Sequence, residues 1–278
     1  MEKVVLITGA SSGIGREAAK YFAAKGWKVI ASMRNPEKED ELTKTDNILV
    51  QKLDVQVPTS IEKAIQNGIE QFGHIDVLIN NAGYGQMGIF EAMTPQQIAR
   101  QFDVNVFGVM NTIRAILPHF RKRKEGLILN ISSGAGKFTL PTLSMYAASK
   151  FAPEGFSEAL SFELSTLNIR VKIVEPGGTE TNFSKVGSEE FAADPALTEY
   201  KPFLDAAGKM FQDLRDARLV SAADVAAVIF NAATDGTNTL RYVIGNDDFM
   251  RRIHARQQMA DQDYVNSIRQ GFTRYLPA

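Results

Sequence analysis

Short apolar runs alternate with longer amphipathic stretches along almost the whole chain. Several of the short runs are apolar at nearly every position, as expected of parallel strands that are covered on both faces. They predict strands over Val4–Thr8, Lys28–Ala31, Ile48–Asp54, Val77–Asn80, Leu127–Ser132, Arg170–Glu175 and Arg241–Gly245. The stretches between them have helical patterns. This alternation predicts a single α/β domain over residues 1–278, with one doubly wound, Rossmann-type parallel sheet flanked by helices on both faces.

Two helix starts are marked by capping signals. The sequence Thr94-Pro95-Gln96-Gln97 has the form of a capping box with proline in the first turn. The sequence Ser221-Ala222-Ala223-Asp224 is a second start signal. Both predict helices that begin directly after the capping residue.

The composition restricts the classes of function. The net charge of −1 over 278 residues gives no reason to expect a nucleic acid or an anionic membrane as a partner. The absence of cysteine excludes disulfides, thiolate metal sites and a cysteine nucleophile, and the histidines have no metal-ligand spacing. No apolar run approaches the ~20 residues of a membrane span, and only Met1–Lys3 precede the first predicted strand. We therefore expect a cytoplasmic protein without a metal site.

A glycine-rich turn follows the first predicted strand and opens a helix. It reads Thr8-Gly9-Ala10-Ser11-Ser12-Gly13-Ile14-Gly15. Glycines let the backbone turn tightly and approach a pyrophosphate, while the helix N-terminus offers free N–H groups and partial positive charge. An ordinary turn is the alternative for the motif alone. Its position between a strand and a helix favours a dinucleotide site.

The end of the second predicted strand bears on the choice between NAD and NADP. An NAD site usually carries an acidic residue there, which holds the ribose hydroxyls. Here the expected acidic position is Met33, and Arg34 follows it. A guanidinium can form a bidentate, charge-assisted bond to a 2′-phosphate, worth ~1.5–3 kcal/mol. A solvated arginine in a polar loop is the alternative, but the sequence favours NADP(H).

Tyr146 and Lys150 are four residues apart, which places them on one face of a helix. An ammonium ~4 Å from a phenolate stabilises it by ~4 kcal/mol at an effective dielectric constant near 20, before desolvation is subtracted. We therefore expect Lys150 to lower the pKa of the Tyr146 hydroxyl. A lowered pKa would make this phenol usable as a general acid or base near neutrality.

Two polar residues could assist this pair. Ser133 stands at the end of a predicted strand, where ligands bind in α/β sheets, and its hydroxyl can bond a substrate oxygen. Asn105 lies inside a predicted helix, where asparagine is unfavourable. It is either tolerated locally or lets a water enter the helical hydrogen-bond ladder and pass protons to Lys150.

The motifs occur together in the order and spacing of the short-chain dehydrogenase/reductase family, which the sequence resembles over about residues 3–181. They are Thr8–Gly15, Asn80-Asn81-Ala82-Gly83, Asn105, Ser133, Tyr146-x-x-x-Lys150 and Pro176-Gly177. The resemblance implies that Tyr146 is the acid/base, Ser133 the orienting hydroxyl and Lys150 the cation that also holds the nicotinamide ribose. It implies a relay role for Asn105, and the spacing to the tyrosine favours Ser133 over its neighbour Ser132.

The resemblance also implies a set of cofactor contacts. Asp54 and Val55 would hold the adenine amino group, and Asn81–Gly83 would line the adenosine ribose. The full set is Gly9, Ser11, Ser12, Gly13, Ile14, Gly15, Arg34, Asp54, Val55, Asn81, Ala82, Gly83, Tyr146, Lys150, Pro176, Gly177, Thr179 and Thr181. The cofactor expected from these contacts is NADP(H).

The segment from about residue 182 to 219 is irregular, and similar enzymes use it as a mobile lid over the substrate. Its aromatic and other apolar residues would form an apolar inner wall, or would only pack short helices onto the domain. They are Phe183, Phe191, Tyr200, Phe203, Met210 and Phe211. Val29–Pro36 and the tyrosine region look most like the branch that contains retinol and hydroxysteroid dehydrogenases. We therefore expect an apolar carbonyl or alcohol as the substrate.

The expected function is that of an NADP(H)-dependent oxidoreductase, which moves hydride between the nicotinamide and a carbonyl or secondary alcohol. The alternative is a catalytically silent protein that senses NADP, although such proteins commonly lose the tyrosine or the lysine. A sugar-nucleotide epimerase or dehydratase is a third reading, disfavoured by the glycine spacing. The family often forms homodimers or homotetramers, and the charged stretch Asp247–Tyr275 has a helical pattern that could pack on a neighbouring subunit.

Overall fold

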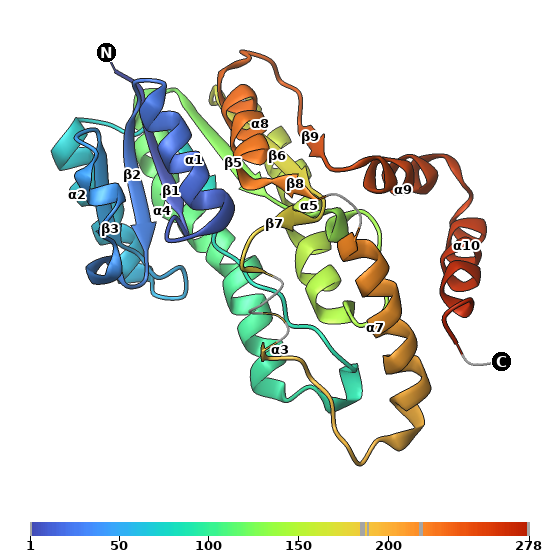
Figure 1. Ribbon diagram of the computed structural model, residues 1–278. Helices are drawn as coiled ribbons and strands as arrows, with labels where there is room; N and C mark the ends of the chain where they lie inside the picture. The colour runs from blue at the N-terminus through green and yellow to red at the C-terminus, as the bar shows by residue number, and fades with distance from the viewer. Residues whose placement is uncertain (1, 184–186, 188, 217–218, 277–278) are drawn as a thin grey trace.

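A seven-stranded parallel sheet forms the centre of the computed structural model, which describes residues 2–183, 187, 189–216 and 219–276. The strands lie in the order β3-β2-β1-β4-β5-β6-β9 (Figure 1), and each pairs with its neighbours in parallel. Their bounds are β1 Val4–Thr8, β2 Lys28–Met33, β3 Ile48–Lys52, β4 Val77–Asn80, β5 Gly126–Ile131, β6 Ile169–Pro176 and β9 Arg241–Ile244. Every strand predicted from the apolar runs is present, with ends that differ by at most two residues. The doubly wound parallel sheet is confirmed.

Helices cover both faces of this sheet. On one face, α1 (Gly13–Ala24) and α8 (Ala222–Thr234) lie side by side (Figure 1) and bury Phe22 and Ile229 against it. The other face is covered by α2 (Pro58–Phe72), α4 (Gly108–Arg123) and α5 (Ser144–Ser165). Strand side chains point alternately to the two faces, so the sheet separates two apolar cores.

The capping signals in the sequence mark true helix starts. Thr94 and Ser221 each form a capping box, at the start of α3 (Pro95–Phe102) and of α8 respectively. Between α3 and α4 the backbone forms a π-helical turn over Asp103–Phe107. The sequence pattern placed Asn105 inside a regular α-helix, and this prediction was wrong. Asn105 lies in a widened turn, a feature that is often found at functional sites.

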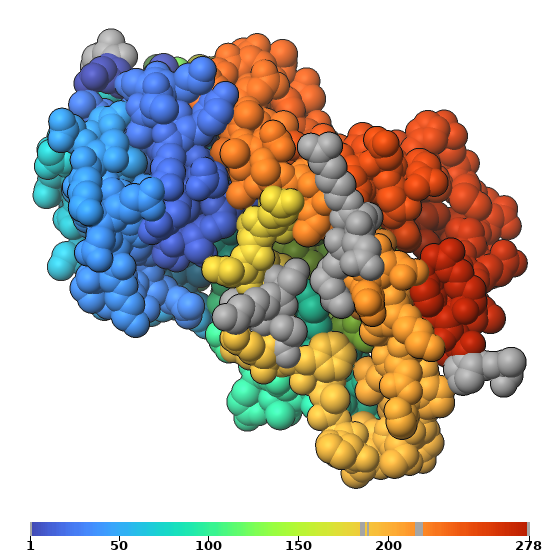
Figure 2. Space-filling model, in the orientation of Figure 1, coloured from blue at the N-terminus to red at the C-terminus, as the bar shows by residue number. Residues whose placement is uncertain are grey.

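The C-terminal part adds elements on one side of the sheet. A short parallel pair, β7 (Thr179–Glu180) and β8 (Val220–Ser221), flanks α7 (Lys201–Asp216). After β9 come α9 (Asp247–Gln258) and α10 (Asp261–Thr273), which extend on the side opposite β3 (Figures 1 and 2). The expected lid over residues 182–219 includes 184–186, 188 and 217–218, which lie outside the described residues.

Candidate active site

The segments that leave the carboxyl ends of the strands enclose a cavity of about 570 Å³. Such an edge is where α/β sheets bind ligands, at the point where the strand order reverses. Nearly every site residue expected from the sequence lines this one cavity. They are Gly9, Ser11, Ser12, Gly13, Ile14, Arg34, Asp54, Val55, Asn81, Ala82, Gly83, Ser133, Tyr146, Lys150, Pro176, Gly177, Thr179 and Thr181. Gly15 and Asn105 do not line it but pack directly behind residues that do.

The glycine turn fits the phosphates of a dinucleotide because side chains have no room in it. Gly9 has φ +69° and Gly13 φ +54°, the left-handed region that favours glycine. A Cβ on Gly9 would lie 2.8 Å from Ala82 Cα, and one on Gly15 would lie 2.5 Å from Gly9 O. Glycine at these positions therefore lets the turn pack closely on the loop after β4, and the backbone of Gly9 and Gly13 lines the cavity.

The N-terminus of α1 has free donors. Ser12 is its N-cap, but the Ser12 side chain makes no capping hydrogen bond. In contrast, Thr94, Ser221 and Asn246 accept such bonds at the starts of α3, α8 and α9. The first N–H groups of a helix carry partial positive charge and bind anions. At α1 they face the cavity without a side chain in competition, which suits a pyrophosphate.

The turn is locked to the loop after β4 by hydrogen bonds. Thr8 Oγ1 accepts from the N–H groups of Asn81 and Ala82, each at 3.0 Å. Asn81 Nδ2 donates to Thr8 O and Gly9 O, also at 3.0 Å. Thr8 and Asn81 thus hold the glycine turn against the loop after β4. They fix the separation of the two strand ends between which a nucleotide would lie.

Three side chains converge at the other end of the cavity. The Tyr146 ring is buried on α5, and its hydroxyl lies within hydrogen-bonding reach of Ser133, which follows β5. Lys150, one turn further along α5, lies with Nζ 6.0 Å from the Tyr146 ring centroid and donates to Ile131 O at 3.0 Å. The predicted grouping of Ser133, Tyr146 and Lys150 is therefore present in space.

The expected direction of the Tyr146 pKa shift was wrong for this structure. Burial raises the pKa of Tyr146 to about 12, and the bond to Ser133 opposes this only in part. Burial also lowers the pKa of Lys150 to about 8, against the attraction of Glu154. The sequence estimate left desolvation out, and the Lys150 ammonium is engaged with a carbonyl rather than with the phenol. The phenol consequently keeps its proton near neutrality.

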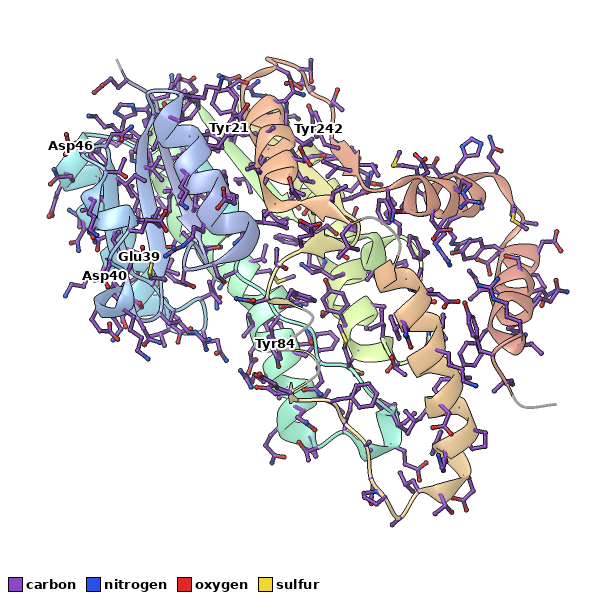
Figure 3. All side chains as sticks on the ribbon, viewed as in Figure 1. Tyr21, Glu39, Asp40, Asp46, Tyr84 and Tyr242 are labelled. Atoms are coloured by element: carbon purple, nitrogen blue, oxygen red, sulfur yellow. The ribbon has the colours of Figure 1, made fainter. Side chains whose placement is uncertain are left out.

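Asn105 is held next to Gly83 and Lys150 by the π-helical turn. Its amide donates to Tyr84 O at 2.9 Å and to Ser149 Oγ at 3.1 Å, and its Oδ1 accepts from Tyr84 N at 3.1 Å. Figure 3 shows Tyr84 beside the α3 helix. A Cβ on Gly83 would lie 3.2 Å from Asn105 Oδ1 and 3.8 Å from Lys150 Nζ, so these groups are neighbours. The Asn105 side chain therefore holds the loop after β4 in place next to Lys150.

Arg34 is exposed directly after β2 and lines the cavity. Among the described residues it makes no ion pair. The carboxylate of the buried Glu39, on the β2–β3 side of the molecule (Figure 3), is already taken up by Arg16 and by the N–H groups of Glu41 and Leu42. An available cation and a neutralised carboxylate at this strand end suit a phosphate group.

Apolar side chains also line the cavity, and several of them were not singled out in the sequence. Of the aromatics in the segment 182–219, Phe183 and Phe211 line it, and Phe183 lies 5.4 Å from Tyr146 between ring centroids. Phe203 instead packs on Phe272, and Tyr200 bonds Glu91. Other lining residues are Met87, Phe138, Leu140, Leu143, Leu214, Leu219, Phe249 and Arg252. The aromatics of this segment thus divide into two that line the cavity, Phe183 and Phe211, and two that contact other parts of the chain, Tyr200 and Phe203.

The short chain dehydrogenase family model matches residues 3–190. The chain belongs to the short-chain dehydrogenase family. An uncharacterized oxidoreductase of Schizosaccharomyces pombe is 40% identical over 217 residues, covering 77% of this chain and 89% of the relative. The 3-ketodihydrosphingosine reductase of Bacteroides thetaiotaomicron is 38% identical over 206 residues, covering 72% and 75% respectively. A short-chain dehydrogenase structure from Streptomyces avermitilis is 33% identical, with a TM-score of 0.79 and coverage of 99% and 96%.

Solved structures similar to this short-chain dehydrogenase hold either nicotinamide cofactor. A serine dehydrogenase complexed with NADP+ is 29% identical, with a TM-score of 0.74 and coverage of 86% of this chain and 94% of that one. A 3-ketoacyl-(acyl-carrier-protein) reductase from Brucella melitensis complexed with NADH is 27% identical, with a TM-score of 0.73 and coverage of 88% and 97%. The protein is thus an oxidoreductase whose relatives use NADP or NAD.

Three further features of this short-chain dehydrogenase concern metal ions, membranes and surface charge. None of its described residues form a group of three or more side chains that could hold a metal ion. None of its described helices is long and apolar enough to cross a membrane. The basic run Arg121–Lys124 lies at the C-terminal end of α4, where cations complement the helix dipole.

Proposed function

We propose that this short-chain dehydrogenase is an NADP(H)-dependent oxidoreductase acting on an apolar carbonyl compound or secondary alcohol. The observation that carries the proposal is the convergence of Ser133, Tyr146 and Lys150 on the cavity that the glycine turn also lines. A protein that only senses the nucleotide would have no need for these three side chains together. We therefore favour the enzyme over the silent alternative.

Proton transfer is the part that the chain's own side chains perform. The Tyr146 phenol, protonated near neutrality, can donate to a carbonyl oxygen as negative charge develops there. The Ser133 hydroxyl, next to that phenol, orients the same oxygen. A bound nicotinamide supplies or accepts the hydride. In our proposal the π-helical turn at Asn105 helps to pass a proton back toward Lys150.

Lys150 has two tasks in this proposal. One N–H of its ammonium is bonded to Ile131 O, which leaves the others for a ribose hydroxyl. Its pKa of about 8 keeps most of the ammonium charged at pH 7. The positive charge would then stabilise a phenolate on Tyr146 once the proton has left.

The preference for NADP(H) rests on the end of β2. Met33 occupies the position where an acidic residue would hold the ribose of NAD, and Arg34 follows it at the cavity wall. The N-terminus of α1 has no side-chain cap, which suits binding of the pyrophosphate of the same cofactor. These features favour a 2′-phosphate, and so NADP(H) over NAD(H).

The apolar substrate is supported by the walls of the cavity and by one relative. Phenylalanine, leucine and methionine side chains line the cavity, and Phe183 among them packs on Tyr146. A relative named 3-ketodihydrosphingosine reductase suggests a ketone with an apolar body. A cytoplasmic location and a homodimer or homotetramer remain parts of the proposal. For the oligomer, the exposed Phe151 and Phe162 on α5 offer an apolar face.

The proposal is tested by removing the phenolic hydroxyl alone. Tyr146→Phe keeps the ring against Phe183, so we expect NADPH binding to be unchanged and turnover of ketones to fall by a factor of roughly 10²–10⁴. Nicotinamide absorbance gives the turnover, and fluorescence titration gives the NADPH dissociation constant. Tyr21→Phe, in α1 and remote from the cavity, is the matched control. Activity retained by Tyr146→Phe would remove Tyr146 from its proposed role.

A further inference from the structure

One wall of the cavity comes from α9, which lies beyond the residues 3–190 that the family model matches. Phe249 stands in the first turn of this helix, and its N–H donates to the capping Asn246 Oδ1 at 2.9 Å. The side chain is buried, only 7% exposed, and packs on Phe138 with ring centroids 5.9 Å apart. A charged C-terminal helix therefore directs one aromatic ring into the site.

The Phe249 ring lies in a cradle of three glycines at the carboxyl ends of neighbouring strands. Gly134 follows β5, Gly177 follows β6 and Gly245 follows β9. A Cβ on them would come within 2.2, 2.8 and 2.0 Å, respectively, of atoms of the Phe249 side chain. Distances this short mean that the ring packs directly against bare backbone. Only glycine at these positions leaves the space that the ring fills.

The cradle adjoins the proposed reacting groups. Gly134 comes directly after Ser133, and Gly177 directly after Pro176. The ring therefore touches the backbone that carries the orienting hydroxyl, and it lies next to two of the expected cofactor contacts, Pro176 and Gly177. We propose that Phe249 is the specificity-determining residue that limits the size of the substrate group on the β9 side of the carbonyl. Given the proposed function, on which this inference rests, that group must be small and apolar.

Charges nearby do not oppose an apolar group. Asp248 and Arg252, the charged α9 residues that line the cavity, pair with each other at 2.8 Å between Oδ2 and Nε. Their charges compensate, so this wall has little net charge to recognise an ionic substrate. The larger part of the substrate would extend toward Phe183, Phe211 and Leu214, where the cavity is lined by other apolar residues.

The test is a series of aryl ketones in which only the alkyl group grows, from methyl through ethyl and propyl to butyl. For the parent enzyme we expect kcat/KM with NADPH to fall as the alkyl group lengthens. Phe249→Ala removes the ring. The ratio of kcat/KM for the butyl ketone to kcat/KM for the methyl ketone should then rise at least about tenfold, because one methylene in a tight pocket changes kcat/KM by about that factor. Phe249→Leu should give a smaller rise. Met250→Ala, at an exposed neighbour on α9, is the matched control and should leave the ratio unchanged.

Each outcome has a distinct meaning. NADPH binding and the melting temperature establish that a variant is folded, and Phe249→Leu is decisive where Phe249→Ala does not fold. An unchanged ratio in a folded Phe249 variant overturns the inference while the proposed function stands. An equal rise in Met250→Ala also overturns it, because general loosening of α9 would then be the cause. If the parent enzyme reduces none of the ketones with either cofactor, the proposed function fails and the inference fails with it.

Discussion

The choice of cofactor should depend on Arg34 more than on any other side chain at the end of β2. Arg34 is exposed, makes no ion pair among the described residues, and lines the cavity. In Arg34→Asp the charge-assisted bond to a 2′-phosphate, worth ~1.5–3 kcal/mol, is lost. The new carboxylate adds repulsion of ~1 kcal/mol for a unit charge at ~4 Å in water. NADPH binding should therefore weaken by roughly a hundred- to a thousandfold relative to NADH.

The assay compares dissociation constants and kcat/KM for NADPH and NADH in the parent and in the variant. Because Arg34 is exposed, salt should screen its effect, and the preference for NADPH should shrink as ionic strength rises. Lys44→Asp makes the same change of charge at an exposed position outside the cavity and is the matched control. Equal weakening of both cofactors by Arg34→Asp would refute the reasoning. So would a similar loss of NADPH preference in Lys44→Asp, since the effect would then be one of overall charge.

Two further predictions concern pH. Burial beside Glu154 raises the pKa of Glu175 from 4.5 to about 7, so the folded protein holds this proton more tightly than the unfolded chain and loses stability as pH rises through that range. Glu175→Gln should remove this loss of stability, whereas Glu158→Gln, at the exposed carboxylate that pairs with Arg241, should not. Urea unfolding at about pH 5 and 8 measures the free energy of unfolding. The same pH dependence of that free energy in the parent and in Glu175→Gln would contradict the prediction. Burial raises the pKa of Tyr146 to about 12, and in the proposed function alcohol oxidation needs the Tyr146 phenolate to accept a proton. Alcohol oxidation should therefore speed up steadily toward alkaline pH, while carbonyl reduction, which needs the protonated phenol, should not. An oxidation rate that is flat above about pH 7 would show that the phenolate already exists there.

The strands and the glycine turn could be predicted because their signals are local. A parallel strand covered on both faces is apolar at nearly every position, and Val4–Thr8 and Val77–Asn80 were located to the residue. Capping boxes at Thr94 and Ser221 follow from residues three apart. The grouping of Ser133, Tyr146 and Lys150 needed only the α/β order of elements and the family's spacing.

The features that were missed depend on contacts between distant parts of the chain. The π-helical turn at Asn105 arises where that side chain bonds both Tyr84 and Ser149, which no periodicity displays. The pKa of Tyr146 rises because of burial that the sequence does not report. Phe249 is one aromatic residue in a charged helical stretch. Its role can be inferred only from its packing against Gly134, Gly177 and Gly245. A glycine after each of three strands was nevertheless a sequence signal that a side chain from elsewhere fills the space.

The sheet order separates the two choices that this enzyme has to make. Arg34 follows β2, whereas the cradle of Phe249 lies at the ends of β5, β6 and β9, with β1 and β4 between. Neighbouring strands are ~4.8 Å apart, and the cradle begins three strands away from β2, so the two residues are separated by at least about 14 Å. Residues at that separation, with no shared partner, contribute nearly independent free energies. If both proposals hold, cofactor preference and substrate size can change separately, without change to Ser133, Tyr146 and Lys150, which follow β5 or lie on α5.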